Sequence, residues 1–410
     1  MKNILVFLLV ILLLDSCSPI IPRSPIPQTE SIQPSFPTST PFSLGKCFDA
    51  RSPTPNPKEA SLFPAIGETD HTVGNPQADV TILDYSDFQC ASCAQIDQLL
   101  SGFVNKYPGK ILFVFRNFPI ITLHDKAALA AQAAEAASQQ NKFWEMHDFL
   151  FQNLKTWETM TPEVFKTWIV QESTSLGIDR NKFSEDFSSQ QVSSRVQKSF
   201  DDGMKINLPG VPILLINGEL VKWEANLFEN LENYVKLAIL SKQQFNSCPD
   251  TVISPGKKYR ANLVTTKGKI TIDLFTDQAP IAVNNFIFLA KKGWFNKTPF
   301  FKVVPNELVE SGDPSGTGFG GPGYFLPTEN NNLLYDRAGM VGMLNTGPNS
   351  NGSQFLITMA PAPNFNGSYP IFGFVSNGMD VLSKLTPYDP NGSNGKNIPD
   401  MIISVQIEEQ

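Results

Sequence analysis

Two cysteines, Cys90 and Cys93, stand where an apolar run ends and a helical pattern begins. The run at residues 80–85 predicts a buried strand, and residues 94–100 predict a helix with its apolar residues on one face. Backbone N–H groups and the helix dipole favour an anion at a helix N-terminus, so we expect the pKa of the Cys90 thiol to be lowered and its reactivity raised. Cys93, one turn further on, is placed to resolve a mixed disulfide.

A Cys-x-x-Cys pair is also half of a zinc site, which is the alternative interpretation. The sequence contains no second such pair, and its three histidines, His71, His124 and His147, form no pair close in sequence. We therefore favour a redox pair with no metal and no cofactor, and expect His124 and His147 to be ordinary surface or helix residues. No histidine follows residue 147, so chemistry in the second half must proceed without imidazole, and a histidine-ligated metal there is excluded.

The sequence around the cysteine pair predicts a sheet with a helical insertion. A second strand at 111–116 gives a strand–helix–strand order, which implies a parallel pair and a right-handed crossover. Residues 126–205 are typical of a long helical section, which begins with an alanine-rich stretch of high helix propensity. The sheet resumes at 211–216, an Asn-Gly turn reverses the chain, and a helix at 227–240 closes the domain.

These motifs resemble the DsbA-type branch of the thioredoxin superfamily over about residues 66–245. The resemblance rests on the Phe-x-Cys-x-x-Cys junction, the alanine-rich helix with its Phe-Trp-Glu-Met-His continuation, and the Gly-Val-Pro before the hairpin. It implies an α/β thioredoxin fold in which the Val211–Pro212 bond is cis and faces the two cysteines. Pro212 then shapes the substrate groove. Whether the pair acts as oxidant, reductase or isomerase is left open.

A different pattern begins after a polar linker at residues 246–257. Many short apolar runs punctuated by Gly and Pro predict strands, interrupted by an amphipathic helix at 279–292 and a short helix at 378–385. Many strands with few helices predict a closed antiparallel β-barrel with two helices. The strands are expected at 260–265, 269–275, 300–304, 339–344, 354–359, 371–375 and 402–407.

Residues 258–410 resemble the cyclophilin family along almost their whole length. The resemblance rests on an opening hairpin at 266–270, a glycine-rich run at 312–324 and a second long run at 345–355. Cyclophilins isomerise prolyl peptide bonds, and the barrier of ~18–20 kcal/mol arises from lost amide resonance. A donor to the prolyl nitrogen lowers this barrier because twisting frees the nitrogen lone pair. No acid–base step is needed.

The cyclophilin resemblance assigns the catalytic roles to Lys302 and Gln354, which act on the prolyl amide. Lys302 stands at the family's arginine position and keeps the charge and three donors, but not the planar fork. Glu307 and Leu356 replace two pocket phenylalanines, Glu310 replaces a glutamine, and Asn364 and Tyr369 replace a tryptophan and a histidine. The substrate-binding residues expected over both domains are Val211, Phe300, Leu308, Glu310, Met343, Asn345, Leu356, Phe365 and Tyr369.

Two carboxylates near Lys302 are expected to weaken its role. Three interpretations therefore stay open for the second domain: a working isomerase, a weak isomerase that mainly binds proline-containing chains, and a structural appendage. Both halves address slow steps of chain folding, so the sequence predicts a folding factor with two activities. The alternative is a redox domain fused to an inactive cyclophilin-like peptide-binding module.

The N-terminus predicts export. One lysine precedes an apolar run at 4–14 that is too short for a stable membrane span. The run ends in Leu-Asp-Ser-Cys17, which resembles a bacterial lipoprotein signal, so we expect residues 1–17 to be a signal and Cys17 to be lipidated; an ordinary signal peptide is the alternative. Residues 18–65, rich in Pro, Ser and Thr, then form an extended tether. The expected location is the cell envelope, anchored through lipid to the extracytoplasmic side of a membrane.

The remaining cysteines and the net charge limit the classes of partner that this chain is expected to have. Cys47 and Cys248 bracket the first domain and are expected to form a structural disulfide, with two free thiols as the alternative. The net charge of −7 arises before residue 251, because twelve basic and twelve acidic residues follow. Nothing is basic enough to indicate nucleic acid. The expected partners are unfolded or proline-containing polypeptides, a redox partner and a membrane.

Overall fold

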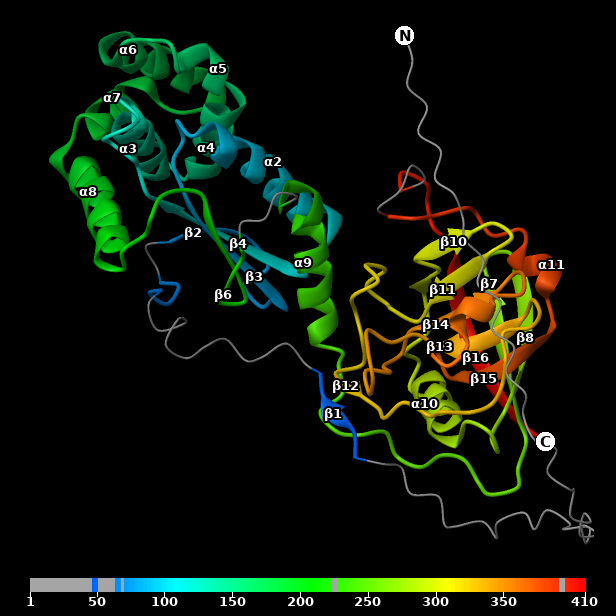
Figure 1. Ribbon diagram of the computed structural model, residues 1–410. Coiled ribbons are helices and arrows are strands. Elements are labelled where there is room, and N and C mark those ends of the chain that lie inside the picture. Colours follow the sequence, from blue (N-terminus) through cyan, green and yellow to red (C-terminus); the bar gives the residue numbers. More distant parts are fainter. Residues whose placement is uncertain (1–45, 51–62, 68–69, 223–226, 391–394) are drawn as a thin grey trace, which may run out of the picture. The chain divides into compact units, whose positions relative to one another are not determined.

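The computed structural model describes residues 46–50, 63–67, 70–222, 227–390 and 395–410 (Figure 1). The predicted signal, the lipidation site Cys17 and most of the predicted tether lie outside these residues. Within the described ranges, no helix is both long enough and apolar enough to cross a membrane.

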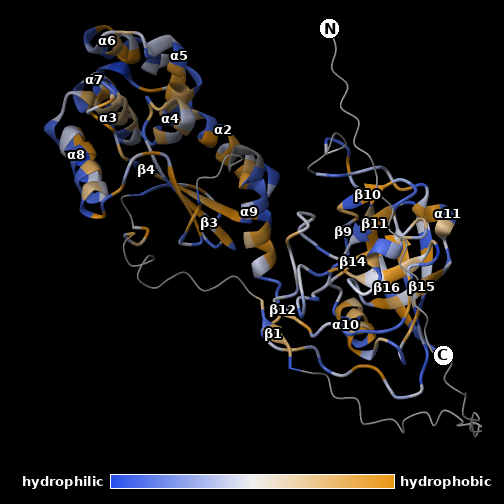
Figure 2. Cartoon of the chain, in the orientation of Figure 1, coloured by the Kyte–Doolittle hydropathy of each residue, from blue (hydrophilic) through white to orange (hydrophobic). Residues whose placement is uncertain are grey.

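The first domain contains a sheet in the order β2-β4-β3-β5-β6. Its strands are β2 His71–Gly74, β3 Val80–Ser86, β4 Ile111–Asn117, β5 Ile213–Ile216 and β6 Glu219–Leu220. The central strand β3 is parallel to β4 and antiparallel to β5, which confirms the predicted parallel pair. Both β3 and β4 are largely buried, and most of their residues are hydrophobic (Figure 2). The edge strand β2 was not predicted, because its four residues are mostly exposed and show no apolar alternation.

The helical section of the first domain is a series of short helices. Its breaks fall at capping residues: the side chains of Thr161, Asp179 and Ser189 each accept a backbone N–H from three residues further on. The alanine-rich α3 contacts α4, α7 and α8, because its small side chains allow close approach. The helices of this domain are α2 Ala91–Lys106, α3 Ala127–Ser138, α4 Phe143–Gln152, α5 Leu154–Trp157, α6 Pro162–Glu172, η1 Ser173–Leu176, α7 Arg180–Phe187, α8 Gln190–Lys205 and α9 Leu227–Ser241.

The second domain is a curled antiparallel sheet in the order β10-β11-β14-β13-β15-β8-β7-β16-β9. Its helices α10 Pro280–Lys291 and α11 Met379–Leu382 match the two that were predicted, and α10 contacts β15 and β16. The strands are β7 Tyr259–Thr265, β8 Gly268–Leu274, β9 Thr298–Pro299, β10 Lys302–Val304, β11 Leu308–Ser311, β13 Met340–Met343, β14 Phe355–Thr358, β15 Ile371–Asn377 and β16 Met401–Glu409.

The predicted closed barrel is not shown, and the sheet is a half-barrel. The two end strands, β9 and β10, have two and three residues, and within the described residues no ladder joins them. They are consecutive in the chain, and Phe300 and Phe301 between them belong to neither strand. The strand predicted over 300–304 is therefore present but shorter, because these two buried aromatic residues continue the apolar run without extending the ladder.

The predicted disulfide between Cys47 and Cys248 is present. It joins the segment before the first domain to the segment after it, with a sequence separation of 201 residues. Next to Cys47, the short strand β1 Phe48–Asp49 pairs with β12 Tyr324–Phe325. Both flanks of the first domain are thus tied together covalently.

Candidate functional site

The cysteine pair lies at the junction between the end of β3 and the start of α2, as the sequence predicts. Cys90 is the N-cap of α2, and its sulfur accepts the backbone N–H of Cys93 at 3.1 Å. The two cysteines form a disulfide, with Cys90 6% exposed and Cys93 fully buried. The hydroxyl of Ser92 lies 3.2 Å from the Cys90 sulfur. Two hydrogen-bonding groups are therefore placed to stabilise a Cys90 thiolate once the disulfide is reduced.

The loop before Cys90 is held by Asp87. One carboxylate oxygen accepts the backbone N–H of Gln89, and the other accepts that of Ile120, each at 2.8 Å. His124 Nδ1 lies 2.8 Å from the second oxygen. His124 was predicted to be an ordinary surface or helix residue, but it lies in the loop between β4 and α3 and is bonded to the active-site loop.

Pro212 lies at the same end of the sheet as the cysteines. The Val211–Pro212 bond is cis, as predicted. Ile213 pairs with Tyr85 near the end of β3, so Pro212 stands beside the point where the chain leaves β3 toward Cys90. Val211 packs against the core cluster that contains both cysteines.

Beneath the cysteine pair lie two buried carboxylates that the prediction did not single out. Asp84, in the middle of β3, is fully buried, and within the described residues neither of its side-chain oxygens has a hydrogen-bond partner. Burial, assisted by the charge of Asp97, raises the pKa of Asp84 well above 3.8, and Ser86 opposes this shift. Burial also raises the pKa of Asp97 to about 6, against the opposing charge of His147.

Sequence signals for these acids exist. Asp84 interrupts an otherwise apolar strand, and Asp97 falls on the helix face that buries Cys93, Ile96 and Leu100. A carboxylate on a core face is unusual enough to mark a position of interest. The fully buried His147 carried no such signal, because it lies between Met146 and Asp148 in a helix that mixes polar and aromatic residues.

Asp97, His147 and Asp148 bring their side-chain ligand atoms within 4.8 Å of one another. However, the two nitrogens of the His147 ring face different carboxylates: Nε2 faces Asp97 and Nδ1 faces Asp148. A cation bound to one nitrogen would not use both carboxylates in this arrangement, so we do not assign a metal site here.

The second site is a row of side chains across three strands of the half-barrel. Lys302 on β10 pairs with Glu310 on β11, which pairs with Leu356 on β14. Directly opposed residues share a face of the sheet, so these three lie side by side. Lys302 Nζ is 3.8 Å from Glu310 Oε1, which confirms that a carboxylate engages the lysine. Burial raises the pKa of Glu310, an effect that Lys302 opposes and Asp389 reinforces.

An apolar cluster adjoins this row. Leu356 and Tyr335 are buried members of this cluster. Phe365 and Tyr369 pack against the cluster and are partly exposed. Leu308 is also half-buried, but Phe300 and Met343 are buried in the main core instead. Glu307 and Asn364 are exposed. Four of the predicted residues therefore lie near one surface: Lys302, Leu356, Phe365 and Tyr369. Phe300 and Met343 do not contribute to this surface.

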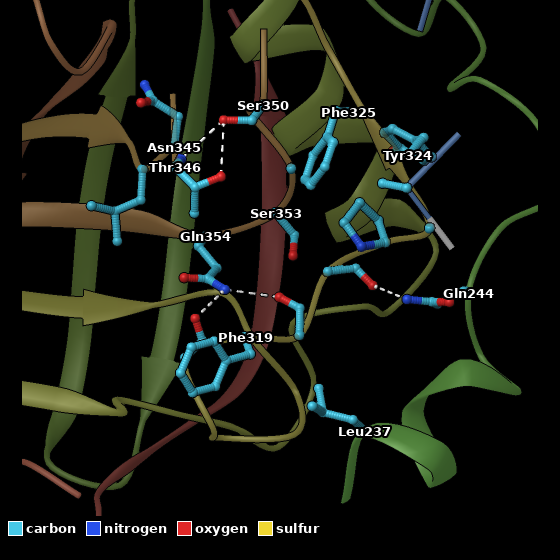
Figure 3. A pocket seen from close by; sticks show the side chains of 18 of the residues that line it. Leu237, Gln244, Phe319, Tyr324, Phe325, Asn345, Thr346, Ser350, Ser353 and Gln354 are labelled. Carbon is cyan, nitrogen blue, oxygen red and sulfur yellow. Dashed lines mark hydrogen bonds between the residues drawn. The ribbon is translucent and has the colours of Figure 1, made fainter. Parts of the chain in front are cut away.

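A cleft of about 420 Å³ lies next to the row (Figure 3). Of the predicted residues, Glu310, Asn345, Gln354 and Tyr369 line it. Gln354 Nε2 donates to the carbonyls of Gly318 and Gly320 at 3.0 and 2.9 Å. Since both bonds go to one loop, Gln354 fixes the glycine-rich wall of the cleft. Asn345 likewise donates to the carbonyl of Ser368 at 2.9 Å.

Comparisons with known proteins agree with both halves of this description. A family model described as cyclophilin type peptidyl-prolyl cis-trans isomerase/CLD matches residues 260–407. A model described as thioredoxin matches residues 67–236. The predicted resemblance to cyclophilins is thereby confirmed, and the other is confirmed at the level of a thioredoxin-like domain.

Individual relatives resemble the cyclophilin-like part. Peptidyl-prolyl cis-trans isomerase-like 1 of Aspergillus niger is 42% identical over 125 residues, which cover 30% of this chain and 77% of the relative. The protein of the same name in Aspergillus oryzae is 37% identical over 150 residues, or 36% of this chain and 93% of the relative. A crystal structure of a Cryptosporidium parvum cyclophilin type isomerase is 33% identical, with a TM-score of 0.35, and covers 37% of this chain and 99% of its own.

Proposed function

Because the chain belongs to the cyclophilin-type peptidyl-prolyl cis-trans isomerase family through residues 260–407, we propose that it is a folding factor with two activities. It isomerises X–Pro bonds in polypeptides, and its Cys90–Cys93 pair exchanges disulfides with the same class of substrate. Both reactions are slow steps in the folding of a chain. One polypeptide that carries both sites raises the effective concentration of each around a shared client.

In the isomerase site, the half-buried apolar cluster beside Leu356 receives the proline ring, and Lys302 donates to the prolyl amide. The donated bond strengthens as the amide twists, so it stabilises the transition state more than the ground state. Gln354 positions the loop that carries Gly318 and Gly320 and so shapes the cleft in which the flanking chain lies. Phe300 and Met343 support the site from the core.

In the redox site, the Cys90 thiolate attacks a client disulfide and forms a mixed disulfide, releasing one client thiolate. Cys93 then attacks the Cys90 sulfur, the bond between Cys90 and the client breaks, and the second client sulfur leaves reduced. The reverse sequence oxidises a client dithiol. The N-cap position of Cys90 and its bond from Cys93 N–H support the role of Cys90 as the attacking sulfur.

Two features support an extracytoplasmic location in the cell envelope. The Cys47–Cys248 disulfide is of the kind that persists in oxidising compartments. The apolar run at residues 4–14 is followed three residues later by Cys17, which we propose as the lipidated residue. Mass spectrometry of Cys17 tests this directly: a diacylglycerol modification supports the anchor, and an unmodified or absent Cys17 contradicts it.

The observation on which the isomerase proposal mainly rests is the Lys302–Glu310–Leu356 row beside an apolar cluster, in a chain of this family. A coupled assay of proline isomerisation with the full chain tests it. Catalysis that Lys302→Ala reduces and Cys90→Ser leaves intact supports the proposal. Catalysis at the same rate without the lysine contradicts the role of Lys302.

A second function has one specific observation in its favour. The contact between Lys302 and Glu310 competes for the ammonium that a prolyl amide needs. If that contact persists with substrate bound, the site binds proline-containing chains without accelerating their isomerisation. Binding of a proline peptide by the full chain with no acceleration of its isomerisation supports this second function.

A further inference from the structure

Two short segments outside the family-matched residues 260–407 border the cleft beside the Lys302 row. One is β1 with the residue that follows it, Ala50, and the other is the stretch that contains Gln244. Ala50 and Gln244 both line the cleft, together with Phe325 of β12 and the glycine-rich loop. The cleft is therefore bounded in part by residues that the match to the cyclophilin-type family does not include.

The first segment is attached to β12 through its backbone. Both residues of β1 pair with β12 in antiparallel register, and the N–H of Ala50 donates to the carbonyl of Gly323 at 3.0 Å. Strand β12 is itself fixed, because Tyr324 is buried and its hydroxyl donates to Asn285 Oδ1 of α10 at 2.8 Å. Strand β1 thus extends a fixed edge and brings Ala50 to the cleft.

The second segment is attached to the same stretch of backbone. Gln244 Nε2 donates to the carbonyl of Gly321 at 2.9 Å (Figure 3), and the N–H of Phe245 donates to the carbonyl of Pro322 at 2.8 Å. The ring of Phe245 packs against three aromatic side chains of the second domain: Phe288, Trp294 and Tyr324. This segment is therefore anchored on the second domain just before the chain reaches Cys248.

The Cys47–Cys248 disulfide joins the two segments directly. Cys47 immediately precedes β1. Cys248 is held to the second domain on both sides, by Phe245 before it and by the carbonyl of Asp250, which accepts the side-chain amide of Asn284 at 2.9 Å. Cys248 is exposed, so this disulfide is accessible to dissolved thiols.

On its own, β1 is weakly held. Both of its residues are exposed, so burial of apolar surface contributes little to keeping it in place. A strand of two residues also forms few ladder bonds to offset the entropy lost when its backbone is ordered. The disulfide spans a sequence separation of 201 residues, and it keeps β1 close to β12 where a long free chain would not.

The glycine-rich loop is consequently held from two directions. Gln354 donates to the carbonyls of Gly318 and Gly320, whereas the two outside segments hold residues 321–325. A backbone rich in glycine has many accessible conformations unless such contacts select one. The shape of this side of the cleft therefore depends on the two outside segments as well as on Gln354.

We propose that residues 48–50 and Gln244 form an outer wall of the substrate cleft and that the Cys47–Cys248 disulfide holds this wall in place. The inference rests on the proposed isomerase function. With the disulfide intact the outer wall is preorganised, so less freedom is lost when a proline-containing chain binds. Lys302 lies on β10, whereas β12 belongs to a different sheet, so loss of the wall weakens binding and leaves the isomerisation step unchanged.

A dithiol reductant opens the disulfide in two steps. A thiolate of the reductant attacks the Cys248 sulfur, the bond to Cys47 breaks, and the Cys47 sulfur leaves with the electron pair and takes a proton from water. The second thiol of the reductant then loses its proton and attacks the first reductant sulfur. Cys248 leaves as a thiolate and is protonated, so both cysteines are reduced and the reductant is oxidised to a disulfide.

Protease-free isomerisation assays on the full chain with an Ala-Pro-containing tetrapeptide test the outer wall, with kcat and KM determined separately. Oxidised wild type is compared with wild type in dithiothreitol and with the double variant Cys47→Ala, Cys248→Ala. We expect KM to rise roughly three- to tenfold in both, as for ordering one or two side chains on binding, and kcat to stay within about twofold. Dithiothreitol should not change the double variant further, which separates this disulfide from Cys90–Cys93.

Ala50→Pro tests the outer wall with the disulfide intact. Proline has no N–H to donate to Gly323, so KM should rise by roughly two- to fivefold, as for the loss of one hydrogen bond. Lys46→Pro, at an exposed position outside β1, is the matched control and should keep the wild-type KM. These two variants keep the test decisive if the double variant fails to fold.

Two results overturn the outer wall while leaving the isomerase function in place. One is an unchanged or lower KM in reduced wild type and in Ala50→Pro, while oxidised wild type isomerises the peptide. The other is a rise in KM of the same size in Lys46→Pro as in Ala50→Pro. An oxidised wild type that does not accelerate isomerisation contradicts the isomerase function itself, and the role of the outer wall with it.

Discussion

The two sites of this chain differ in what surrounds their reactive groups. In the domain of the cysteine pair, Asp84 and Asp97 are buried. The ring of His147 is also buried and packs against core side chains such as Phe88 and Phe115. At the Lys302 site, the surroundings are an apolar cluster and the carboxylate of Glu310, which Asp389 influences, in a domain without histidine. The first site is rich in groups that exchange protons, and the second has few.

The difference follows from the chemistry proposed for each site. Thiol–disulfide exchange moves protons on and off sulfur, so its rate depends on nearby acids and bases. Prolyl isomerisation breaks no bond and needs only a donor and an apolar wall that favour the twisted amide. The contrast implies that pH should strongly affect the first activity and only weakly affect the second.

The largest difference between the two activities is expected for the Cys90→Ser variant. A serine hydroxyl is not ionised near neutral pH, so disulfide exchange should fall by at least about 10³-fold. Isomerisation should stay within about twofold of wild type, because the reaction at Lys302 uses no thiol. Parallel exchange and isomerisation assays on one preparation measure both. Loss of both activities together contradicts independent sites.

Lys302→Ala is expected to have the converse effect. Removing one charge-assisted donor costs about 1.5–3 kcal/mol of transition-state stabilisation, or a loss of roughly 10- to 160-fold in kcat/KM for isomerisation. Exchange at Cys90 should not change. Lys302→Arg should match or exceed wild type because the guanidinium adds donors. Lys291→Ala, an exposed lysine on α10, is the control; an equal loss there contradicts a specific role for Lys302.

Asp84→Asn tests whether the buried acids destabilise the first domain. The pKa of Asp84 is raised in the folded state, so the fold retains this proton to higher pH than the unfolded chain does. The stability associated with protonated Asp84 is therefore present below about pH 4 and lost as pH rises through the folded-state pKa. We expect the variant to be more stable at about pH 7 by about 2–4 kcal/mol.

Denaturant unfolding of the wild type and the Asp84→Asn variant at about pH 4 and pH 7 measures this effect. The two proteins should converge at the lower pH. If the two proteins are equally stable at about pH 7, other groups in the protein offset the cost of burying the Asp84 carboxylate. That result would contradict the proposed contrast between the sites.

The smallest effect is expected from Glu310→Gln, which releases Lys302 from its carboxylate. Isomerisation should rise by about two- to fivefold at about pH 7, in line with a partly exposed ion pair worth up to about 1 kcal/mol. Burial raises the pKa of Glu310, so the gain should shrink as pH falls through that pKa and the wild-type carboxylate becomes neutral. A pH series of isomerisation rates checks both statements. An unchanged or slower variant shows that Glu310 does not restrain Lys302.

Much of the fold could be predicted because its signals are local. The strand–cysteine–helix junction, the alanine-rich α3 and the helix α10 are each encoded in the periodicity of one segment. The bond between Asp87 and His124 could not, because it joins residues 37 apart through loop geometry that spacing does not encode. The same holds for Gln354, which reaches the carbonyls of a loop more than thirty residues away.

The ion pair at the isomerase site could not be predicted without the register of strand pairing. The sequence predicted two carboxylates near Lys302 but did not show which of them contacts it. The ladder of β10 and β11 sets Glu310 directly opposite Lys302, whereas Glu307 is exposed. The predicted closure of the sheet was wrong for a related reason. The sequence pattern indicates how many strands are present but not whether the two edge strands pair with each other.

The central claim is that the two activities depend differently on titrating groups, and alkylation of Cys90 in the reduced protein tests it most directly. A sulfur at the N-cap of α2 that accepts the Cys93 N–H should be a thiolate well below the value of about 8.5 for a free thiol. We therefore expect the alkylation rate with iodoacetamide to reach half its maximum well below about pH 8. A half-maximum near about pH 8.5, the behaviour of an ordinary thiol, contradicts the account.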